Sequence, residues 1–456
     1  MSLIASVSGI RGTIGGYSGD NLSPIDIVRF TSAYGRLIKG SKQKATVVLG
    51  RDGRISGEMV ASLVLGSLQA MGINVIQTGL STTPTVEMAV VFHKADGGII
   101  LTASHNPKEW NALKLLNAKG EFISSAEGLQ IIEWSKQDST HFSSIYELGQ
   151  IQVDKNSIQQ HVKSILELPF ILVEQIRNSK FKVIVDCINS TGALAIPPLL
   201  DALNVDYQLL NSDINGDFAH NPEPLPENLS SLLEAAKNGF DLGIAVDPDV
   251  DRLAFVDDQG CYFGEEYTLV AVADYMLGIK PGNTVSNLSS SRALRDLTIA
   301  RGGNHYTSSV GEVHVVNKMK EVNAIIGGEG NGGVILPDLH YGRDALVGIA
   351  LILSNMASKK QSLRKLKTNY PMYEMHKDKI ILKPEINYDE LIKFLTSEYK
   401  NERVNLEDGL KIDFENSWVH LRKSNTEPIV RIYSEAKTQS DAMLLSEKIK
   451  DKIEHF

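Results

Sequence analysis

The stretch GIILTASHNP, residues 98–107, decides how this chain is interpreted. Its first four residues form a continuous apolar run that is typical of a buried strand, and the turn that begins at Ser104 ends that strand. The hydroxyl of Ser104 therefore stands at the carboxyl end of a strand, where open α/β sheets place their chemistry. A Ser-His dipeptide in a loop is ordinary by itself, so more distant segments must decide whether Ser104 is functional.

Strand and helix patterns alternate around this stretch. Residues 46–49 and 74–77 predict further strands, and residues 58–71 and 85–93 predict helices. Such alternation favours a parallel sheet with helices on both faces. A similar rhythm begins again near residue 155 and once more after residue 258, whereas the C-terminal part predicts several strands and one closing helix.

A chain of 456 residues is too long for one hydrophobic core. We predict an α/β protein with three similar mixed α/β domains and a smaller C-terminal α+β domain. The charged stretch 358–368 is the expected linker into the last domain. The predicted domains span residues 1–154, 155–257, 258–368 and 369–456.

Composition excludes several classes of protein. The chain has no apolar run of about 18 residues, so we expect no transmembrane helix, and its N-terminus does not resemble a signal peptide. The net charge of −9 disfavours nucleic acid and anionic membranes as partners. The only cysteines, Cys187 and Cys261, fit a reducing cytoplasm better than a disulfide framework.

Three aspartates, Asp247, Asp249 and Asp251, alternate along a short turn between two predicted strands, residues 242–246 and 253–256. Unpaired anions this close would repel one another, and a shared cation would bring them together. Together with the Ser104 oxygen they would make an all-oxygen site, for which Mg²⁺ is the expected ion.

Two other interpretations of the aspartates compete with a metal site. An EF-hand needs Gly at loop position 6 and Glu at position 12, where this chain has Arg252 and Asp258, and its flanks should be helices. A solvated acidic turn stays open, although apolar strands on both sides count against it.

Further loops carry groups that suit a phosphate or the hydroxyls of a sugar. The basic loop 422–428 with Arg431 offers guanidinium, hydroxyl and amide donors for a phosphate, or else it is only a polar hairpin. The glycine-rich loop 327–333 contains Glu329 and Asn331, which could bond sugar hydroxyls, or it is only a flexible turn. Arg11 could contact a phosphate or form a surface ion pair, and Lys114 could reach the Ser104 site or be a solvated charge.

Taken together, these segments resemble the α-D-phosphohexomutase superfamily, which includes phosphoglucomutase, phosphomannomutase and phosphoglucosamine mutase. The resemblance covers nearly the whole chain. Residues 102–107 resemble the phosphoserine loop, 247–252 the metal loop, 328–333 the sugar loop and 422–431 the phosphate loop. Four such motifs in the family's order are far more specific than any one of them.

The resemblance implies four domains around a central cleft and a phosphoryl group on Ser104. It implies one Mg²⁺ per chain, held by Ser104 and the three aspartates, and a hexose bisphosphate as primer and intermediate. Arg11 and Lys114 match positions near the transferred group, and His105 is a further catalytic candidate. The substrate-binding residues implied or inferred are Arg252, Glu329, Asn331, Arg422, Ser424, Asn425, Thr426 and Arg431.

The sequence departs from the family pattern at several positions. In the sugar loop, Asn331 stands where Ser is usual and Gly333 where His is usual, a variant that resembles archaeal-type phosphoglucosamine mutases. Lys423 replaces a common Pro, and residues 7–8 read Val-Ser where Thr-Asp is common. The missing His leaves the proton-transfer group open. The candidates to compensate for it are His105, His314 and His340.

Our first hypothesis is a mutase that interconverts hexose 6-phosphate and hexose 1-phosphate, with glucosamine phosphate preferred over glucose and mannose phosphates. A metal-dependent sugar phosphatase, which loses its phosphoryl group to water, is the alternative from another reaction class. A catalytically silent sugar-phosphate sensor is a third possibility, although binding alone needs no nucleophile. The sequence leaves the oligomeric state open.

Overall fold

The computed structural model of the protein describes residues 2–6, 9–137, 140–382, 386–423 and 429–456. These residues form four β-sheets, and the chain divides into two compact units. The first unit comprises residues 1–275 and 331–368, and the second comprises residues 276–330 and 369–456. We describe each unit by itself.

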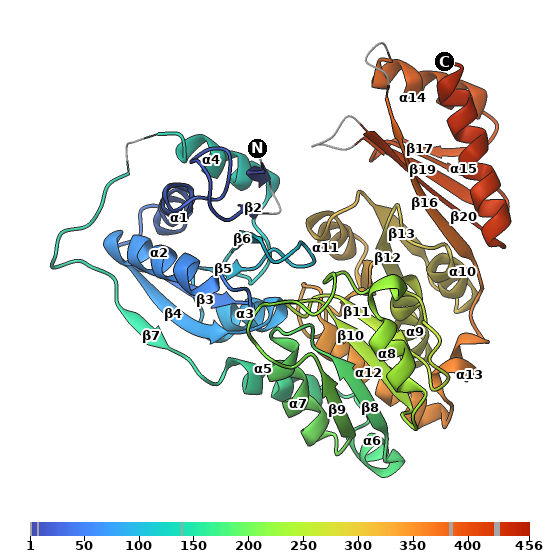
Figure 1. The fold of residues 1–456 in the computed structure, drawn as a ribbon, viewed down its shortest axis with the longest axis horizontal. Coiled ribbons are helices and arrows are strands. Elements are labelled where there is room, and N and C mark those ends of the chain that lie inside the picture. Colours follow the sequence, from blue (N-terminus) through green and yellow to red (C-terminus); the bar gives the residue numbers. More distant parts are fainter. Residues whose placement is uncertain (1, 7–8, 138–139, 383–385, 424–428) are drawn as a thin grey trace. The chain divides into compact units, whose positions relative to one another are not determined.

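The first sheet has seven strands in the order β1-β2-β6-β5-β3-β4-β7. Strand β3 lies parallel to both β4 and β5, and β6 joins β5 antiparallel, which makes the sheet mixed. Apolar residues of α1, α2 and α4 pack on one face, and those of α3 pack on the other. The strands are β1 (Ile4–Ser6), β2 (Gly9–Thr13), β3 (Ala45–Arg51), β4 (Ile73–Leu80), β5 (Gly97–Leu101), β6 (Trp110–Leu116) and β7 (Ile151–Val153). The helices are α1 (Pro24–Lys39), α2 (Gly57–Ala70), α3 (Thr83–Phe92) and α4 (Ser125–Trp134) (Figure 1).

The second sheet has the order β11-β10-β8-β9, in which β11 alone runs antiparallel to its neighbour. Helix α8 covers one face of this sheet through an apolar cluster. Helix α12 is buried over thirteen of its fifteen residues and packs against α5, α6 and α7. The strands are β8 (Lys182–Asp186), β9 (Asp206–Leu210), β10 (Leu242–Val246) and β11 (Leu253–Val256). The helices are α5 (Ser157–Leu166), α6 (Val173–Ser179), α7 (Gly192–Ala202), α8 (Ser230–Ala236) and α12 (Ala345–Lys359), with the short strand β15 (Gly333–Ile335) before α12.

The second unit contains two sheets. Strand β12 (Asn283–Asn287) lies between β13 (His305–Ser308) and β14 (Ala324–Glu329) and is parallel to both. The C-terminal sheet is antiparallel, in the order β16-β20-β19-β18-β17, and the helices α14 and α15 contribute to its core. Its strands are β16 (Glu374–Ile381), β17 (Arg403–Asn405), β18 (Leu410–Asp413), β19 (Trp418–Lys423) and β20 (Ile429–Ala436). The helices of this part are α10 (Ala293–Ala300), α11 (Glu312–Glu321), α14 (Tyr388–Glu398) and α15 (Gln439–Glu454), and α9 (Glu265–Ile279) leads into the unit.

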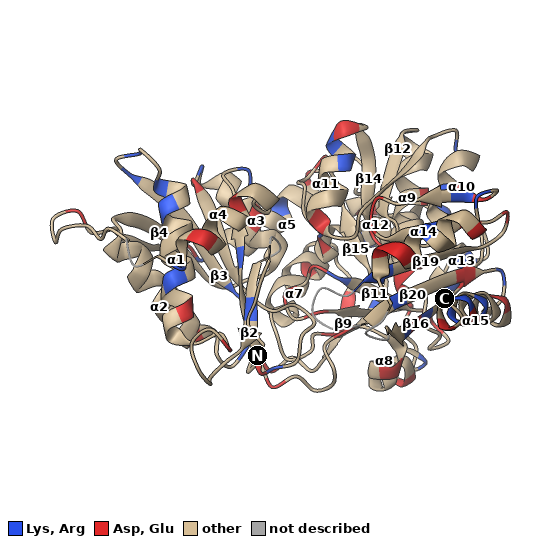
Figure 2. Ribbon diagram, turned by 90° about the horizontal axis from the view of Figure 1, so that it is seen from above, with Lys and Arg blue, Asp and Glu red and all other residues tan. Residues whose placement is uncertain are grey.

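The predicted fold class is confirmed, because three α/β sheets precede a C-terminal antiparallel sheet. The expected linker 358–368 contains the short helix α13 (Leu363–Lys367), whose Leu363 and Leu366 are buried. Among the described residues, no helix combines the length and apolar character that crossing a membrane requires. Basic and acidic residues are interspersed along both units (Figure 2).

Candidate active site

Ser104 lies just beyond β5 in a backbone conformation that non-glycine residues rarely adopt. Its φ is +49°, in the left-handed region. Such a conformation persists only where the surroundings impose it, and it is frequent at functional sites. The residue is only 7% exposed, and its hydroxyl donates a hydrogen bond to Asp247 Oδ2 at 2.6 Å. The strand and turn predicted from the sequence thus deliver this hydroxyl to the aspartate loop.

A buried guanidinium holds the Ser104 loop in this shape. Arg54 is 1% exposed and donates hydrogen bonds to the carbonyl oxygens of Ser104, Asn106, Pro107 and Trp110 at 2.6–2.9 Å. Its Nε forms a 3.0 Å ion pair with Asp52. Because a guanidinium presents five donors in a fixed plane, Arg54 can satisfy several loop carbonyls at once.

Arg54→Ala is expected to lower the free energy of unfolding by about 3–5 kcal/mol, because it leaves the buried Asp52 carboxylate without its cation and the loop carbonyls without donors. Thermal and urea unfolding would measure the change. Arg51→Ala is the matched control, since Arg51 pairs with the exposed Glu58 and donates to the carbonyl oxygen of Asp52, and its loss should cost much less. Equal stability of the two variants would contradict this role for Arg54.

The aspartate loop connects β10 to β11. Val250, in the middle of the loop, has a φ of +61°, which is an outlier for a β-branched residue. Ser190 and Thr191, at the start of α7, donate hydrogen bonds to the carbonyl oxygen of Pro248 at 2.7 and 2.8 Å. Thr83 donates its backbone N–H to Asp249 O and its hydroxyl to Asp249 Oδ2. Contacts from the starts of α7 and α3 therefore impose the strained conformation of the turn.

The three aspartates are fully buried, and their carboxylate oxygens lie within 4.8 Å of one another. Lys114 Nζ lies 2.7 Å from Asp249 Oδ2 and 3.1 Å from Asp251 Oδ2. Arg343 Nη2 lies 2.8 Å from Asp251 Oδ2. Lys114 and Arg343 thus offset much of the negative charge of the three aspartates, whose burial would otherwise be unfavourable.

The protonation of these groups follows from their surroundings. Burial raises the pKa of Asp247, and the neighbouring Asp251 and Asp249 raise it further. Burial alone would also raise the pKa of Asp251, but Arg343, Lys114 and Arg252 hold it below its usual range. Burial lowers the pKa of Lys114, yet Asp249 and Asp251 outweigh burial and raise it. Lys114 therefore stays protonated and supplies positive charge beside the aspartates.

The residues present fit a divalent cation. Asp249 Oδ1 and Asp251 Oδ1 are buried and accept no hydrogen bond, whereas the other oxygen of each carboxylate faces a cation. Buried carboxylate oxygens without a donor are unfavourable unless something positive lies beside them. With Asp247 Oδ2 and the Ser104 hydroxyl they offer an all-oxygen set, which suits Mg²⁺.

The departure at Gly333 has a structural reason. A Cβ at this position would lie 2.3 Å from Cδ of Arg343. A side chain at residue 333 would therefore displace the arginine that reaches Asp251. The space that a histidine side chain would need at residue 333 is occupied by Arg343.

Three other predicted site residues, His105, Arg252 and Arg11, lie in the first unit. His105 is largely buried, and burial together with Arg252 lowers its pKa, so that the imidazole is neutral. Arg252 donates its backbone N–H to Asp247 Oδ1 and forms a 3.2 Å ion pair with Glu223. Arg11 on β2 pairs in register with Ala112, two residues before Lys114 on β6, so Arg11 and Lys114 are diagonal neighbours on one face of the sheet.

The glycine-rich loop spans the boundary between the two units, which divides it after Gly330. In the second unit, Glu329 Oε1 accepts hydrogen bonds from Asn287 Nδ2 at 2.9 Å and from the backbone N–H of Gly311 at 3.1 Å. In the first unit, Asn331 Oδ1 accepts a hydrogen bond from the backbone N–H of Gly333 at 3.3 Å. Their assignment to substrate binding stays a prediction.

A row of cations crosses the C-terminal sheet in the second unit. Arg431 on β20 pairs in register with Arg422 on β19 and with Lys379 on β16, so the three side chains share one face. Like charges directly opposite one another are unfavourable, and an anion would relieve them. Asp408 lies 2.8 Å from Arg422 Nε and offsets part of the charge. The predicted residues Ser424, Asn425 and Thr426 lie outside the described residues.

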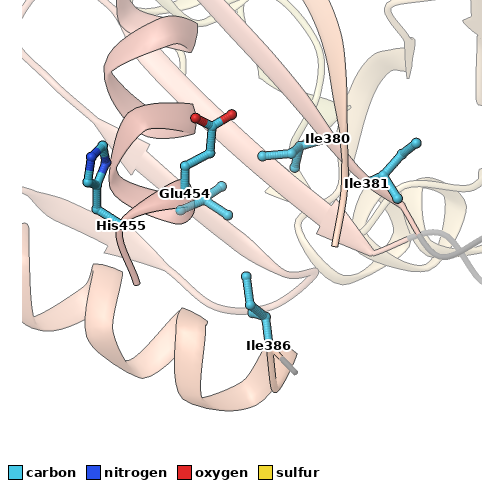
Figure 3. A pocket seen from close by; sticks show the side chains of 6 residues that line it. Ile380, Ile381, Ile386, Glu454 and His455 are labelled. Atoms are coloured by element: carbon cyan, nitrogen blue, oxygen red, sulfur yellow. The ribbon is translucent and has the colours of Figure 1, made fainter. Parts of the chain in front are cut away.

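The same face contains a cavity of about 390 Å³ lined by Lys379, Arg431 and Tyr433 among others. A second cavity of the C-terminal domain, about 400 Å³, lies elsewhere and is lined mainly by isoleucines. It contains none of the predicted site residues (Figure 3). The cationic row, rather than the apolar cavity, is therefore the phosphate-binding candidate of this unit.

Comparison with known proteins decides the family. Models of the phosphoglucomutase/phosphomannomutase alpha/beta/alpha domains I, II and III match residues 3–141, 159–260 and 264–373, and the model of the C-terminal domain matches residues 384–452. The chain belongs to the α-D-phosphohexomutase superfamily. It is a phosphohexomutase, an intramolecular phosphotransferase, and sugar phosphates are its class of substrate.

Individual relatives of this phosphohexomutase carry different names. The phosphoglucomutase/phosphomannomutase of Thermococcus kodakarensis is 33% identical over 94% of this chain and 95% of its own length. The phosphoglucosamine/phosphogalactosamine mutase of Sulfurisphaera tokodaii is 30% identical over the full length of both chains.

Solved structures show the same fold. A phosphoglucomutase/phosphomannomutase family protein from Burkholderia thailandensis has a TM-score of 0.84 at 24% identity, with 99% of this chain and 97% of that chain covered. The N-acetylphosphoglucosamine mutase of Aspergillus fumigatus, in complex with GlcNAc-6P and magnesium, has a TM-score of 0.58 at 14% identity, with 94% and 96% covered.

Sequence reasoning missed two residues of the candidate site, Thr83 and Arg343, and it left Arg54 as either a phosphate contact or a surface ion pair. Asp344 is the N-cap of α12. An aspartate directly before an apolar helical pattern predicts a helix start, and this signal would have placed Arg343 in the loop just before that helix. The Asp52–Arg54 spacing at a strand end was visible but is equally typical of a surface ion pair. Nothing in the sequence around Thr83 points to Asp249.

Proposed function

We propose that this phosphohexomutase interconverts hexose 6-phosphate and hexose 1-phosphate by reversible phosphorylation of Ser104. One observation carries the proposal. The Ser104 hydroxyl, in a strained turn, lies 2.6 Å from Asp247 beside two buried carboxylate oxygens that accept no hydrogen bond. A serine placed in this way can hold a phosphoryl group next to a cation, which a purely structural serine does not need.

In the proposed reaction, the free hydroxyl of the substrate attacks the phosphorus carried by Ser104. The bond from Ser104 Oγ to phosphorus breaks as the bond from the sugar oxygen forms, which gives a hexose bisphosphate. The attacking hydroxyl loses its proton to His105, whose lowered pKa leaves its imidazole neutral. The bisphosphate then reorients, and Ser104 Oγ attacks the phosphorus of the other phosphate. The bond from that phosphorus to the sugar oxygen breaks, and His105 gives its proton to that oxygen, which regenerates the phosphoserine and releases the product. Lys114 and Arg11 offset the charge of the phosphoryl group.

The three aspartates and the Ser104 oxygen are the residues that would hold Mg²⁺. When bound, the ion supplies Lewis acidity at the oxygens of the transferred group. The donor set and the two hydrogen-bond-free oxygens support this choice of ion. The magnesium in the Aspergillus fumigatus relative supports it as well.

We propose glucosamine phosphate as the preferred substrate. Support comes from the Asn331/Gly333 form of the sugar loop and from the relative that acts on phosphoglucosamine and phosphogalactosamine. The more similar phosphoglucomutase/phosphomannomutase makes glucose and mannose phosphates the competing substrates. In either case, the cationic row of Lys379, Arg422 and Arg431 would bind the phosphate that is not reacting.

An isomerisation assay across the 6-phosphates of glucosamine, galactosamine, glucose and mannose tests this proposal. With Mg²⁺ and a bisphosphate primer, we expect 1-phosphate to form from glucosamine 6-phosphate with the highest kcat/KM. Inorganic phosphate should accumulate much more slowly. Faster release of phosphate than of 1-phosphate would indicate a phosphatase, and a higher kcat/KM for glucose or mannose phosphate would refute the substrate assignment.

A further inference from the structure

A second cluster of metal-ligating side chains lies in the first unit, outside the aspartate loop. It contains His161 from α5, His340 from the loop between β15 and α12, and Asp344, the N-cap of α12. His161 and Asp344 are fully buried, and the His340 side chain is 11% exposed. One ligand atom from each lies within 4.8 Å of the others. None of these residues belongs to the proposed phosphoryl-transfer chemistry.

We propose that His161, His340 and Asp344 bind a divalent cation of the zinc class. The His161 and His340 Nε2 atoms lie 2.9 and 3.4 Å from the same atom, Asp344 Oδ2. A tetrahedral zinc ion with bonds of about 2.0–2.2 Å separates its ligand atoms by about 3.3–3.6 Å. Small side-chain movements would therefore seat an ion between these three atoms. Two imidazoles and one carboxylate form a ligand set that suits zinc better than magnesium.

The atoms behind the ligands support the assignment. A metal-binding histidine usually donates its other ring N–H to an oxygen, which fixes the ring. His161 Nδ1 lies 2.9 Å from the Thr85 hydroxyl, and His340 Nδ1 lies 3.3 Å from Glu87 Oε2. Asp344 Oδ1 accepts the backbone N–H groups of Leu346 and Val347 at the start of α12. His161 and Asp344 thus have hydrogen-bond partners on their far sides, and His340 Nδ1 faces the Glu87 carboxylate at ion-pair distance without a hydrogen bond.

The charge of the cluster also favours a cation. Glu87 and Asp344 are two buried carboxylates facing two imidazoles. The two buried carboxylates create a negative potential at the imidazoles, which would hold a divalent ion.

An ion at this position would join segments that are far apart in the sequence. Helix α5 would be tied to the loop before α12, and Glu87 connects the cluster to α3. The same loop carries Arg343, whose guanidinium contacts Asp251. Bound zinc would therefore stabilise the loop that brings Arg343 to the aspartates. This site does not depend on the proposed phosphoryl transfer, so either can fail without the other.

Cobalt and zinc titrations of the chelator-treated full-length protein test the proposal. Excess Mg²⁺ is present throughout to occupy the aspartates. We expect one Co²⁺ per chain with the visible absorption bands of tetrahedral coordination, displacement by Zn²⁺, and a higher melting temperature with Zn²⁺. Absence of a stoichiometric, magnesium-resistant site in the unmodified protein would overturn the proposal.

Three variants locate the site. His340→Gln alone and combined with His161→Gln should abolish the cobalt bands, and Glu87→Gln should weaken zinc binding about 10- to 100-fold. His93→Gln is the matched control, because His93 pairs with the single carboxylate of Asp154 at 2.8 Å and has no second imidazole. If the double variant fails to fold, His340→Gln and Glu87→Gln still decide the matter. Undiminished binding in both would place the ion elsewhere and overturn the assignment.

Discussion

Replacing Ser104 with alanine is expected to lower kcat for isomerisation by about 10⁴-fold or more, because the variant has no oxygen to carry the phosphoryl group. The fold should survive. Arg54 bonds the backbone carbonyl of residue 104 rather than its side chain, so the substitution leaves that anchor in place. The side chain loses only its hydrogen bond to Asp247, and the cost is about 1 kcal/mol.

Intact-mass analysis after incubation with a hexose bisphosphate checks this result. The unmodified protein should gain one phosphoryl group, which peptide analysis should place on Ser104, and Ser104→Ala should gain none. Ser62→Ala is the control, since Ser62 bonds only the Glu58 carbonyl on the exposed side of α2. Near-normal turnover by Ser104→Ala, or phosphorylation of another residue at the same rate, would refute the mechanism.

Replacing Asp247 with asparagine is expected to separate activity from stability. The amide oxygen can still accept the backbone N–H groups of Asp251 and Arg252, and the amide N–H can donate to Ser104. The variant removes one of three buried charges that repel one another, so its melting temperature should be equal or higher. Mg²⁺ affinity should fall, and loss of several kcal/mol of Lewis-acid stabilisation should reduce turnover about 10³-fold or more.

A comparison with Asp251→Asn sharpens this second prediction. Asp251 faces both Lys114 and Arg343, so its neutralisation leaves two buried cations with fewer partners and should cost about 3–5 kcal/mol of stability. Calorimetric Mg²⁺ titration and thermal unfolding of both variants provide the measurements. Asp257→Asn, in the turn after β11, is the control for a buried loop aspartate outside the triad. This account would be contradicted if the Asp247→Asn variant unfolded as readily as the Asp251→Asn variant, or if it kept normal activity.

The predicted fold class followed from patterns that depend on local physics. The apolar run before Ser104 could form only a buried strand or part of a buried helix, and the Asn-Pro turn after it limited its length. Alternation of such runs with helical patterns then favoured α/β domains, which the structure confirms. Element bounds were less exact, and α3 begins two residues before the predicted helix because Thr82 caps it.

The roles of buried polar residues were beyond prediction for a physical reason. Arg51 ends β3 and Arg54 follows three residues later, each directly after a glycine, yet Arg54 is buried against four carbonyls while Arg51 pairs with an exposed glutamate. The residues that flank each arginine in the sequence do not indicate which of the two side chains is buried. That decision depends on where the loop after β5 passes, roughly fifty residues later along the chain.

By itself, the amino-acid sequence determined the α/β class, the order of four motifs and the residues capable of the chemistry, because strand patterns, turns and side-chain types are local properties. Only the tertiary structure decided which charges meet. It brought Ser104 to Asp247, Arg343 into the space left by Gly333, and His161 to His340. Such contacts join residues up to 179 positions apart, and they depend on the packing of whole elements rather than on neighbours in the chain.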